Sequence, residues 1–324
     1  MSDWTGQDGS TTSARYLQMV ECGVRGVSPS YERLCLGVAD DPDVLALLDT
    51  LPPPKRQPNL LLAAVRFLDG PVDSYPTFRA FVLARWDQLS ATMLQRRTQT
   101  NEPRRCATLL PVLSALPQPL ALLEIGASAG LCLYPDRYAY RYLTDDGEHR
   151  VGTGPVEFSC TVTGPVLLPG RVPEVAWRAG LDLNPLDVRD DEDVRWLESL
   201  IWPEQHDRFD LLRGAVQIAR AEPADRRGDL LTDLPSLVAQ VPPEATFVLL
   251  HSAVLAYLGV ADRIRFADIV RAVERPPCWL SNEAPGVLAG TAQIGSGRSC
   301  FVLACDGAPV ALTGPHGQSL EWLA

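Results

Sequence analysis

The sequence has few basic residues for its length of 324 residues. Its 29 Lys and Arg residues stand against 40 Asp and Glu residues, which gives a net charge of −11 at pH 7. Sequence-independent nucleic-acid binding needs a cationic surface, so we expect no nucleic-acid partner. Long apolar runs are also lacking: none reaches the roughly 18 residues of a membrane span. The N-terminus lacks the basic and apolar segments of a signal peptide. We therefore expect a cytoplasmic protein that does not associate with membranes.

The sequence has no local pattern typical of a metal site. Its four histidines and eight cysteines are scattered, and no two cysteines form a Cys-x-x-Cys pair. Several cysteines lie inside apolar runs, which is typical of small buried residues in a reducing compartment. We therefore expect no metal.

A glycine turn follows the most informative apolar run of the chain. The run at 120–125 predicts a buried strand with Glu124 near its end, and Gly126 and Gly130 then bracket Ser128. Because glycine has no Cβ, such a turn lets a ligand approach the backbone closely. A carboxylate at the end of a strand can accept hydrogen bonds from a ribose or an amine. The pattern predicts a strand, a turn and a helix that together hold a nucleotide-like cofactor.

The same residues also spell Gly-x-Ser-x-Gly, the nucleophile-elbow pattern of serine hydrolases. Ser128 would then be the nucleophile, and an acid followed by His251 or His316 would complete the triad. That fold requires several strands before the elbow, whereas residues 1–117 predict helices. A plain strand–helix turn and a non-catalytic nucleotide-binding relative stay open as further alternatives.

The chain is expected to have an all-helical N-terminal region, residues 1–117, followed by an α/β domain, residues 118–324. Within the first part, 74–97 carries apolar residues at helical spacing, and Asn101 is expected to cap the next helix, with Pro103 in its first turn.

Short apolar runs alternate with helical stretches in the second part. The expected strands are 120–125, 175–182, 246–251, 277–282 and 299–305, with a weaker one near 227–230. The expected helices are 190–200, 204–220, 233–240 and 261–274. Such alternation predicts an α/β fold with a mostly parallel sheet and helices on both faces. A small β-rich insertion is expected at about 134–174, and Asp306-Gly307 is expected to turn an antiparallel hairpin at the C-terminus.

The order of these features resembles the class I S-adenosylmethionine-dependent methyltransferases over about residues 118–324. The motifs that carry the resemblance are Glu124-Ile-Gly-Ala-Ser-Ala-Gly130, Gly180-Leu-Asp182, Gly228-Asp229, the run from Phe247 to His251 and the final hairpin. The resemblance implies a Rossmann-like, seven-stranded, mostly parallel sheet with a C-terminal antiparallel hairpin. It also implies S-adenosylmethionine as cofactor and methyl transfer to an N or O atom of a small-molecule substrate. Ser128 stands where the family has a middle glycine.

The resemblance assigns the cofactor contacts to six residues. Glu124, Gly126, Ser128 and Gly130 would hold the amino-acid end of the cofactor, Asp182 the ribose and Asp229 the adenine. The residues alone leave two alternatives open: Asp182 can form an Asx turn before Pro185, and Asp229 can serve in a turn or cap a helix.

Candidate catalytic residues follow two predicted parallel strands. His251, Asn282 and Glu283 stand at strand ends, where open α/β sheets place their ligand crevice. A histidine, with an ordinary pKa of about 6.5, can serve as a base near neutral pH. The alternative is a structural role for each. Substrate contacts are expected from Asn101, Glu102, Tyr138, Trp202 and Tyr257, although the aromatic residues fit packing equally well.

A second likeness extends over nearly the whole chain. Several short motifs resemble those of a conserved bacterial family known only as a domain of unknown function, and this likeness supplies no reaction. These motifs are Asp136-Arg-Tyr138, 182–187, 202–205, 251–257, 281–286 and Pro315-His-Gly317.

Overall fold

The computed structural model describes residues 11–99 and 101–323. The chain divides into two compact units. One, the sheet unit, comprises residues 101–190 and 211–323, and the other, the helical unit, comprises residues 11–99 and 191–210. This grouping differs from the predicted boundary at residue 117, because α7 (Cys106–Ala115) lies in the sheet unit and α8 (Asp191–Leu200) in the helical unit. No helix in the described part of the chain is both long and apolar enough to cross a membrane.

The helical unit is built around α4 (Pro58–Phe67), in which seven of ten residues are buried. Ser28 and Asp41 cap the helices that follow them: their side-chain oxygens accept backbone N–H groups, and each is followed by a proline in the first turn. The predicted helix at 74–97 is in fact two helices that meet at Arg85. Besides α4 and α8, the unit contains α1 (Thr12–Met19), α2 (Pro29–Ala39), α3 (Pro42–Asp49), α5 (Tyr75–Ala84) and α6 (Trp86–Gln95).

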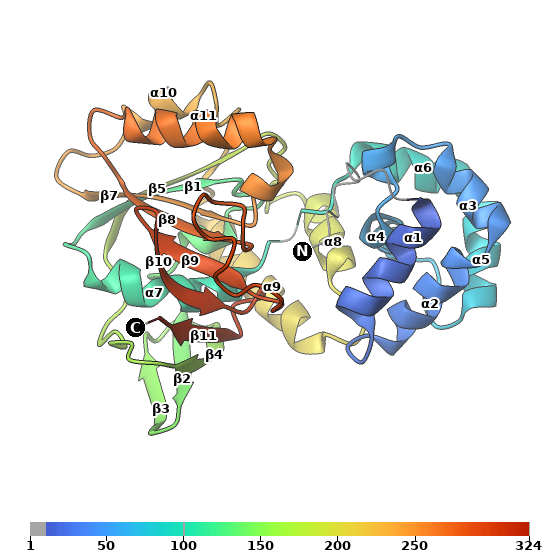
Figure 1. Ribbon diagram of the computed structural model, residues 1–324, viewed down its shortest axis with the longest axis horizontal. Helices are drawn as coiled ribbons and strands as arrows, with labels where there is room; N and C mark the ends of the chain where they lie inside the picture. The colour runs from blue at the N-terminus through green and yellow to red at the C-terminus, as the bar shows by residue number, and fades with distance from the viewer. Residues whose placement is uncertain (1–10, 100, 324) are drawn as a thin grey trace. The chain divides into compact units, whose positions relative to one another are not determined.

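The sheet unit contains one 11-stranded sheet in the order β3-β2-β4-β11-β10-β9-β8-β7-β1-β5-β6 (Figure 1). Most strand pairs are parallel, and the antiparallel pairs are β2·β3, β8·β9, β9·β10 and β10·β11. The strands are β1 (Leu120–Ile125), β2 (Ala139–Thr144), β3 (Gly147–Val151), β4 (Glu157–Thr163), β5 (Val175–Asp182), β6 (Asp225–Arg227), β7 (Thr246–Ser252), β8 (Cys278–Glu283), β9 (Phe301–Cys305), β10 (Ala308–Thr313) and β11 (Ser319–Trp322). The prediction of a mixed α/β fold with a mostly parallel sheet is confirmed.

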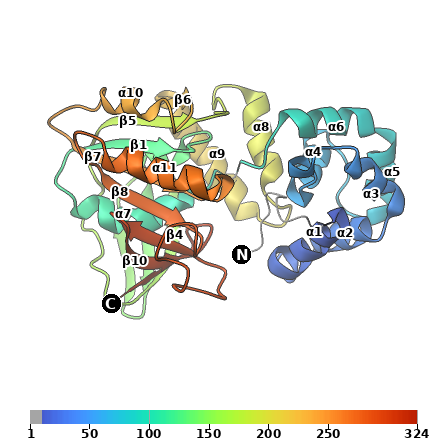
Figure 2. The same cartoon turned by 45° about the horizontal axis from the view of Figure 1, so that its top comes forward.

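Helices cover both faces of the central strands. On one face, α10 (Leu234–Val238) and α11 (Val260–Arg271) bury Leu234, Phe266 and Val270 against Leu123 and Leu249 of the sheet. Figure 2 shows α11 running across β7 and β8, and α7 lies on the other side of the sheet. The remaining helix, α9 (His206–Ala221), begins in the helical unit and ends in the sheet unit. Residues that alternate along each central strand therefore point to two different buried layers.

The expected β-rich insertion extends the main sheet. Strands β2, β3 and β4 form its end, where β4 pairs in parallel with β11 (Figure 1). The expected C-terminal hairpin is present: Cys305 pairs with Ala308 across the turn at Asp306 and Gly307, both of which have positive φ. The long gap between the first and second central strands is thus filled by strands of the same sheet.

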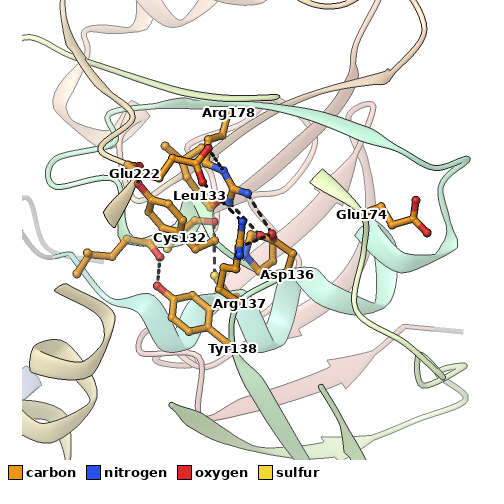
Figure 3. Close-up of polar contacts among 12 residues, drawn as sticks. Cys132, Leu133, Asp136, Arg137, Tyr138, Glu174, Arg178 and Glu222 are labelled. Carbon is orange, nitrogen blue, oxygen red and sulfur yellow. Dashed lines mark hydrogen bonds and ion pairs between the residues drawn. The ribbon is translucent and has the colours of Figure 1, made fainter. Parts of the chain in front are cut away.

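The helix predicted after Gly130 is absent, and this part of the sequence prediction is wrong. Only a three-residue 3-10 helix, Leu131–Leu133, follows the turn. Buried side chains bind the carbonyl oxygens that a helix would use: the Tyr138 hydroxyl donates to Leu131 O at 2.7 Å, and the Arg178 guanidinium donates to Leu133 O at 2.7 Å. Arg178 also holds both carboxylate oxygens of Asp136, at 2.9 and 3.0 Å (Figure 3). The segment is therefore held against β5 as a compact loop.

Candidate functional site

Several segments that are far apart in the sequence converge where β1, β7 and β8 end. Asn101 binds both ends of the turn after β1: its amide nitrogen donates to Ala127 O at 2.7 Å, and its amide oxygen accepts Leu131 N–H at 3.2 Å. The Arg105 guanidinium donates to the carbonyl oxygens of Ser252, the last residue of β7, and of Pro315. Asn101 thus holds the glycine turn, a role that the sequence did not predict.

The turn itself, residues 126–130, has a left-handed backbone at three positions. Gly126 has φ 67°, Ser128 has φ 53° and Gly130 has φ 69°. The backbone of a residue with a Cβ atom rarely adopts this conformation. Serine in the middle position therefore carries strain of about 1–2 kcal/mol that glycine would avoid. Ser128 therefore stands in a position whose backbone favours the glycine that the methyltransferase pattern has there.

The space next to each glycine differs. A Cβ on Gly126 would lie 2.2 Å from a methyl carbon of Val254, so the loop after β7 occupies the room that this glycine leaves. A Cβ on Gly130 would have only Leu133 Cδ1 within 4 Å, at 3.4 Å. The space beside Gly130 is therefore less filled by neighbouring side chains than the space beside Gly126.

Two side chains at the turn have buried oxygens without a hydrogen-bond partner among the described residues. These buried oxygens are Oε2 of Glu124 and Oγ of Ser128. Burial raises the pKa of the Glu124 carboxyl well above its usual range; Cys132 and Asp182 add to this, and the Arg105 charge opposes it. Unsatisfied buried polar atoms are rare in folded proteins and call for a specific explanation. A polar ligand would satisfy both atoms.

Asp182 connects the end of β5 to the turn after β1. Its Oδ2 accepts the Ser128 N–H at 2.9 Å, and its Oδ1 accepts the Asn184 N–H at 2.7 Å, which is the Asx turn that the sequence left open. Each carboxylate oxygen has a second lone pair, so a ribose hydroxyl can still donate to it. Asp229 similarly organises its own loop, since its Oδ1 accepts the Leu231 N–H at 2.8 Å.

His251 lies in a buried polar network on the face of the sheet covered by α11, in which Glu283 Oε2 alone has no partner among the described residues. The Trp279 indole N–H donates to His251 Nε2 at 2.9 Å, so Nδ1 carries the proton that it shares with Glu283 Oε1 at 2.7 Å. Glu283 Oε1 also accepts the backbone N–H groups of Val254 and Leu255. All three network side chains are buried, and both ring nitrogens of His251 are engaged. This geometry suits a structural role, while the predicted catalytic role stays a prediction.

Strand register separates His251 from Glu124. Ile125 pairs with His251, and Glu124 pairs with Leu250. Because neighbouring residues of a strand point to opposite faces, Glu124 lies on the face opposite His251. Asn282 lies on the Glu124 face, where its amide oxygen accepts the Thr313 hydroxyl at 2.7 Å and its nitrogen donates to Ser252 Oγ at 3.1 Å.

The expected substrate residues lie in different surroundings. Glu102 is buried beside His316, whose Nδ1 lies 3.5 Å from its carboxylate, and Glu102, not Asn101, caps the 3-10 helix at Pro103–Arg105. Tyr138 is buried beneath the turn. Tyr257 is 58% exposed beside α11. Trp202 belongs to the helical unit, where its indole donates to Asn59.

Three residues of this region went unnoticed in the sequence: Arg105, Arg178 and Trp279. None belongs to a motif, and their roles depend on strand pairing and on loops that meet only in the fold. One signal was present for Arg178, a charged residue in the middle of an apolar strand, because such residues are rarely buried unless paired.

The geometry gives little support to a serine-hydrolase site. A serine nucleophile needs a base within hydrogen-bond reach. Within the described part of the chain, no histidine contacts Ser128 Oγ, and His251 is engaged on the opposite face.

Comparison with known proteins gives one match. The model of a family described as "Uncharacterized protein conserved in bacteria (DUF2332)" matches residues 13–322. No curated protein and no solved structure matches the chain.

Proposed function

The chain belongs to this bacterial family, DUF2332, and we propose that its sheet unit binds S-adenosylmethionine at the turn after β1 and transfers a methyl group to a small molecule. The observation that carries the proposal is the order of the five parallel strands, β6-β5-β1-β7-β8, together with the glycine turn that follows β1. Numbered along the chain, these strands run 3-2-1-4-5, the order of Rossmann-like sheets.

The position of the turn supports the same site. Connections from β1 run to one side of the sheet and connections to β7 return to the other, so the strand order reverses next to β1. In such sheets ligands bind outside the carboxyl ends of the strands at this reversal. Glu124 and Ser128 leave buried oxygens unsatisfied at this place.

The proposal assigns each part of the cofactor to residues around the turn. Glu124 would accept hydrogen bonds from its amino group, the backbone around Gly130 would lie along its amino-acid end, Asp182 would hold the ribose, and Asp229 would lie toward the adenine. When bound, S-adenosylmethionine supplies a methyl group on a positively charged sulfur. The protein's task is then to align an N or O nucleophile with that methyl group, which is an orientation effect.

The buried carboxyl of Glu124 gives the proposal a specific thermodynamic signature. An ammonium group beside it favours the ionised carboxylate, which lowers the raised pKa of Glu124. Binding of a ligand with an ammonium group should therefore release up to about one proton.

Calorimetry in two buffers of different ionisation enthalpy tests this directly. S-adenosylmethionine and its demethylated product, S-adenosylhomocysteine, should bind with an observed heat that changes with the ionisation enthalpy of the buffer, and this change gives the number of protons released. 5′-Methylthioadenosine lacks the amino-acid end and should bind more weakly, without that release. The absence of binding heat for the two amino-acid-bearing ligands at millimolar concentration, with folded protein, would refute the proposal.

Asp182→Asn is the test variant: it removes the charge and one of the two oxygens that accept the Ser128 and Asn184 N–H groups, so its thermal midpoint must be compared with that of the wild type. We expect it to weaken binding about tenfold, equivalent to about 1.4 kcal/mol. Asp187→Asn, five residues further along the same loop, should bind as the wild type does. Gly126→Val is unsuitable as a probe, because its side chain would displace Val254.

A further inference from the structure

Two cysteines and an aspartate that are separated in the sequence meet at the other end of the central strands. Cys278 Sγ lies 3.6 Å from Cys305 Sγ, and Cys305 Sγ lies 3.9 Å from Asp306 Oδ2. One ligand atom from each of the three residues lies within 4.8 Å of the other two. All three atoms could thus contact one ion.

Strand pairing explains why these residues meet. Cys278 begins β8 and Cys305 ends β9, and these strands are antiparallel, with Leu280 opposite Cys305. Asp306 is the first residue of the β9–β10 turn, where its φ of 50° directs the chain back along the sheet. The cluster is separated from Glu283 by the length of β8, about 16 Å at 3.3 Å per residue. It is therefore distinct from the candidate site described above.

The spacing of the sulfur atoms matches a shared tetrahedral ion. Two thiolates at 2.3 Å from zinc, in tetrahedral geometry, lie about 3.8 Å apart. The separation of 3.6 Å between Cys278 and Cys305 is close to this value. A hydrogen bond also orients the carboxylate: Asp306 Oδ1 accepts the backbone N–H of Trp279 at 2.8 Å, which leaves Oδ2 on the side of the sulfur atoms.

We propose that Cys278, Cys305 and Asp306 bind a thiophilic divalent cation of the zinc type, with water in the fourth position. Binding displaces one proton from each thiol, and both protons go to solvent. No electron is transferred, so the step needs no oxidant. The ion would tie the start of β8 to the β9–β10 hairpin. This proposal departs from the expectation of no metal, which rested on local ligand spacing in the sequence.

Access is consistent with an exchangeable ion. Cys278 and Cys305 are half-buried and Asp306 is exposed, so a hydrated ion can reach them. The two sulfur atoms lie 3.6 Å apart, and either thiol can donate to the other until an ion replaces their protons.

The competing use of the same pair is a reversible disulfide. Two thiols would then lose two electrons and two protons to an oxidant such as a peroxide, which would leave as water. The two uses differ in one respect that experiment can separate: the metal site requires reduced sulfur atoms and a carboxylate, whereas the disulfide requires neither the carboxylate nor an ion.

The test uses the full chain, reduced with a phosphine, stripped with a chelator and titrated with Zn²⁺ or Co²⁺. We expect one equivalent of Zn²⁺ by elemental analysis and loss of two thiols from reaction with a thiol reagent. Co²⁺ should give sulfur-to-cobalt absorption in the near ultraviolet. Less than 0.2 equivalents of Zn²⁺ at about 10 μM free ion would overturn the proposal, as would zinc binding that is equal in Cys278→Ser and wild-type protein.

Variants separate the metal site from the turn and from the disulfide. Asp306→Asn keeps an oxygen for the Trp279 N–H and tolerates the left-handed turn, and it should weaken zinc binding at least about tenfold. Cys22→Ser removes an exposed thiol elsewhere and should change nothing. If Asp306→Asn binds zinc as the wild type does, while both proteins lose two mass units in peroxide, the pair is a disulfide site and the proposal is wrong.

Discussion

Two groups of buried polar side chains on the neighbouring strands β1, β7 and β8 differ in how they use their hydrogen-bonding capacity. In the group of His251, Trp279 and Glu283, both ring nitrogens and the indole N–H are paired, and one glutamate oxygen accepts three donors. In the group of Glu124 and Ser128, buried oxygens have no partner among the described residues. We therefore expect the first group to stabilise the fold and the second to contribute to the proposed ligand site.

The comparison shows why a position at a strand end is too coarse a criterion for a site. The sequence assigned His251, Glu283 and the turn that follows Glu124 to one crevice, because each follows an apolar run. Register then places Glu124 and His251 on opposite faces of the sheet. The two groups also differ in their hydrogen bonds, because most polar atoms of the His251 group are paired. Glu283 Oε2 is the exception in that group, since it has no partner among the described residues.

The largest expected effect is on the His251 network. His251→Phe would leave the Trp279 indole N–H unpaired and remove a donor from the buried Glu283 carboxylate. Loss of one partner from a buried, hydrogen-bonded pair costs about 3 kcal/mol or more. We expect the free energy of unfolding of this variant, measured by urea denaturation, to fall by that amount.

His206→Phe is the control, because His206 is exposed at the start of α9, and it should change stability by less than about 0.5 kcal/mol. A His251→Phe protein of wild-type stability that has lost ligand turnover would instead make His251 a functional residue and reverse the comparison.

An intermediate effect, dependent on pH, is expected for Glu124→Gln. The folded-state pKa of Glu124 is raised, so its stabilising contribution is fully present below its unfolded pKa and is lost as pH rises through the folded value. The variant should therefore gain stability relative to wild type above about pH 4.5, at about 1.4 kcal/mol per unit of elevation. Urea denaturation at several pH values measures this gap.

Glu321→Gln provides a control of opposite sign. The Arg298 side chain lowers the pKa of Glu321, so its contribution is present above the unfolded pKa and is lost as pH falls through the folded one. This glutamate is largely exposed, so the effect should be small. If the difference in unfolding free energy between Glu124→Gln and wild type stays constant or shrinks as the pH rises, the Glu124 carboxyl is not buried without a compensating charge.

The smallest expected effect concerns backbone strain. Ser128→Gly relieves a left-handed serine, and the gain is partly offset by the greater freedom of glycine in the unfolded chain. We expect a thermal midpoint within a few degrees of wild type. A fluorophosphonate probe should not label the wild-type protein; stoichiometric labelling of Ser128 would favour the serine-hydrolase alternative.

The sequence predicts the central strands well because their residues are buried on both faces. β1 and β5 begin and end where the apolar runs predicted, and the Asp306-Gly307 turn is where its residue types indicated. The prediction of a helix after Gly130 was wrong, because the side chains of Arg178 and Tyr138 bind the carbonyl oxygens that a helix would have used.

The content of the candidate site was only partly predictable. Glu124 and Asp182 could be found because they end apolar runs. The pairing of His251 with Trp279, and the meeting of Cys278 with Cys305, depend on the register between β7, β8 and β9, which no local pattern encodes.

Hydrogen exchange of the backbone amides, with and without saturating S-adenosylhomocysteine, tests the central claim most directly, because it reports both binding and its place. The account predicts ligand-dependent protection in peptides that cover the turn at 126–131 and the loop at 182–186, with little change at 251–255. Unchanged exchange in both of the first two segments, or protection confined to 251–255, would contradict it.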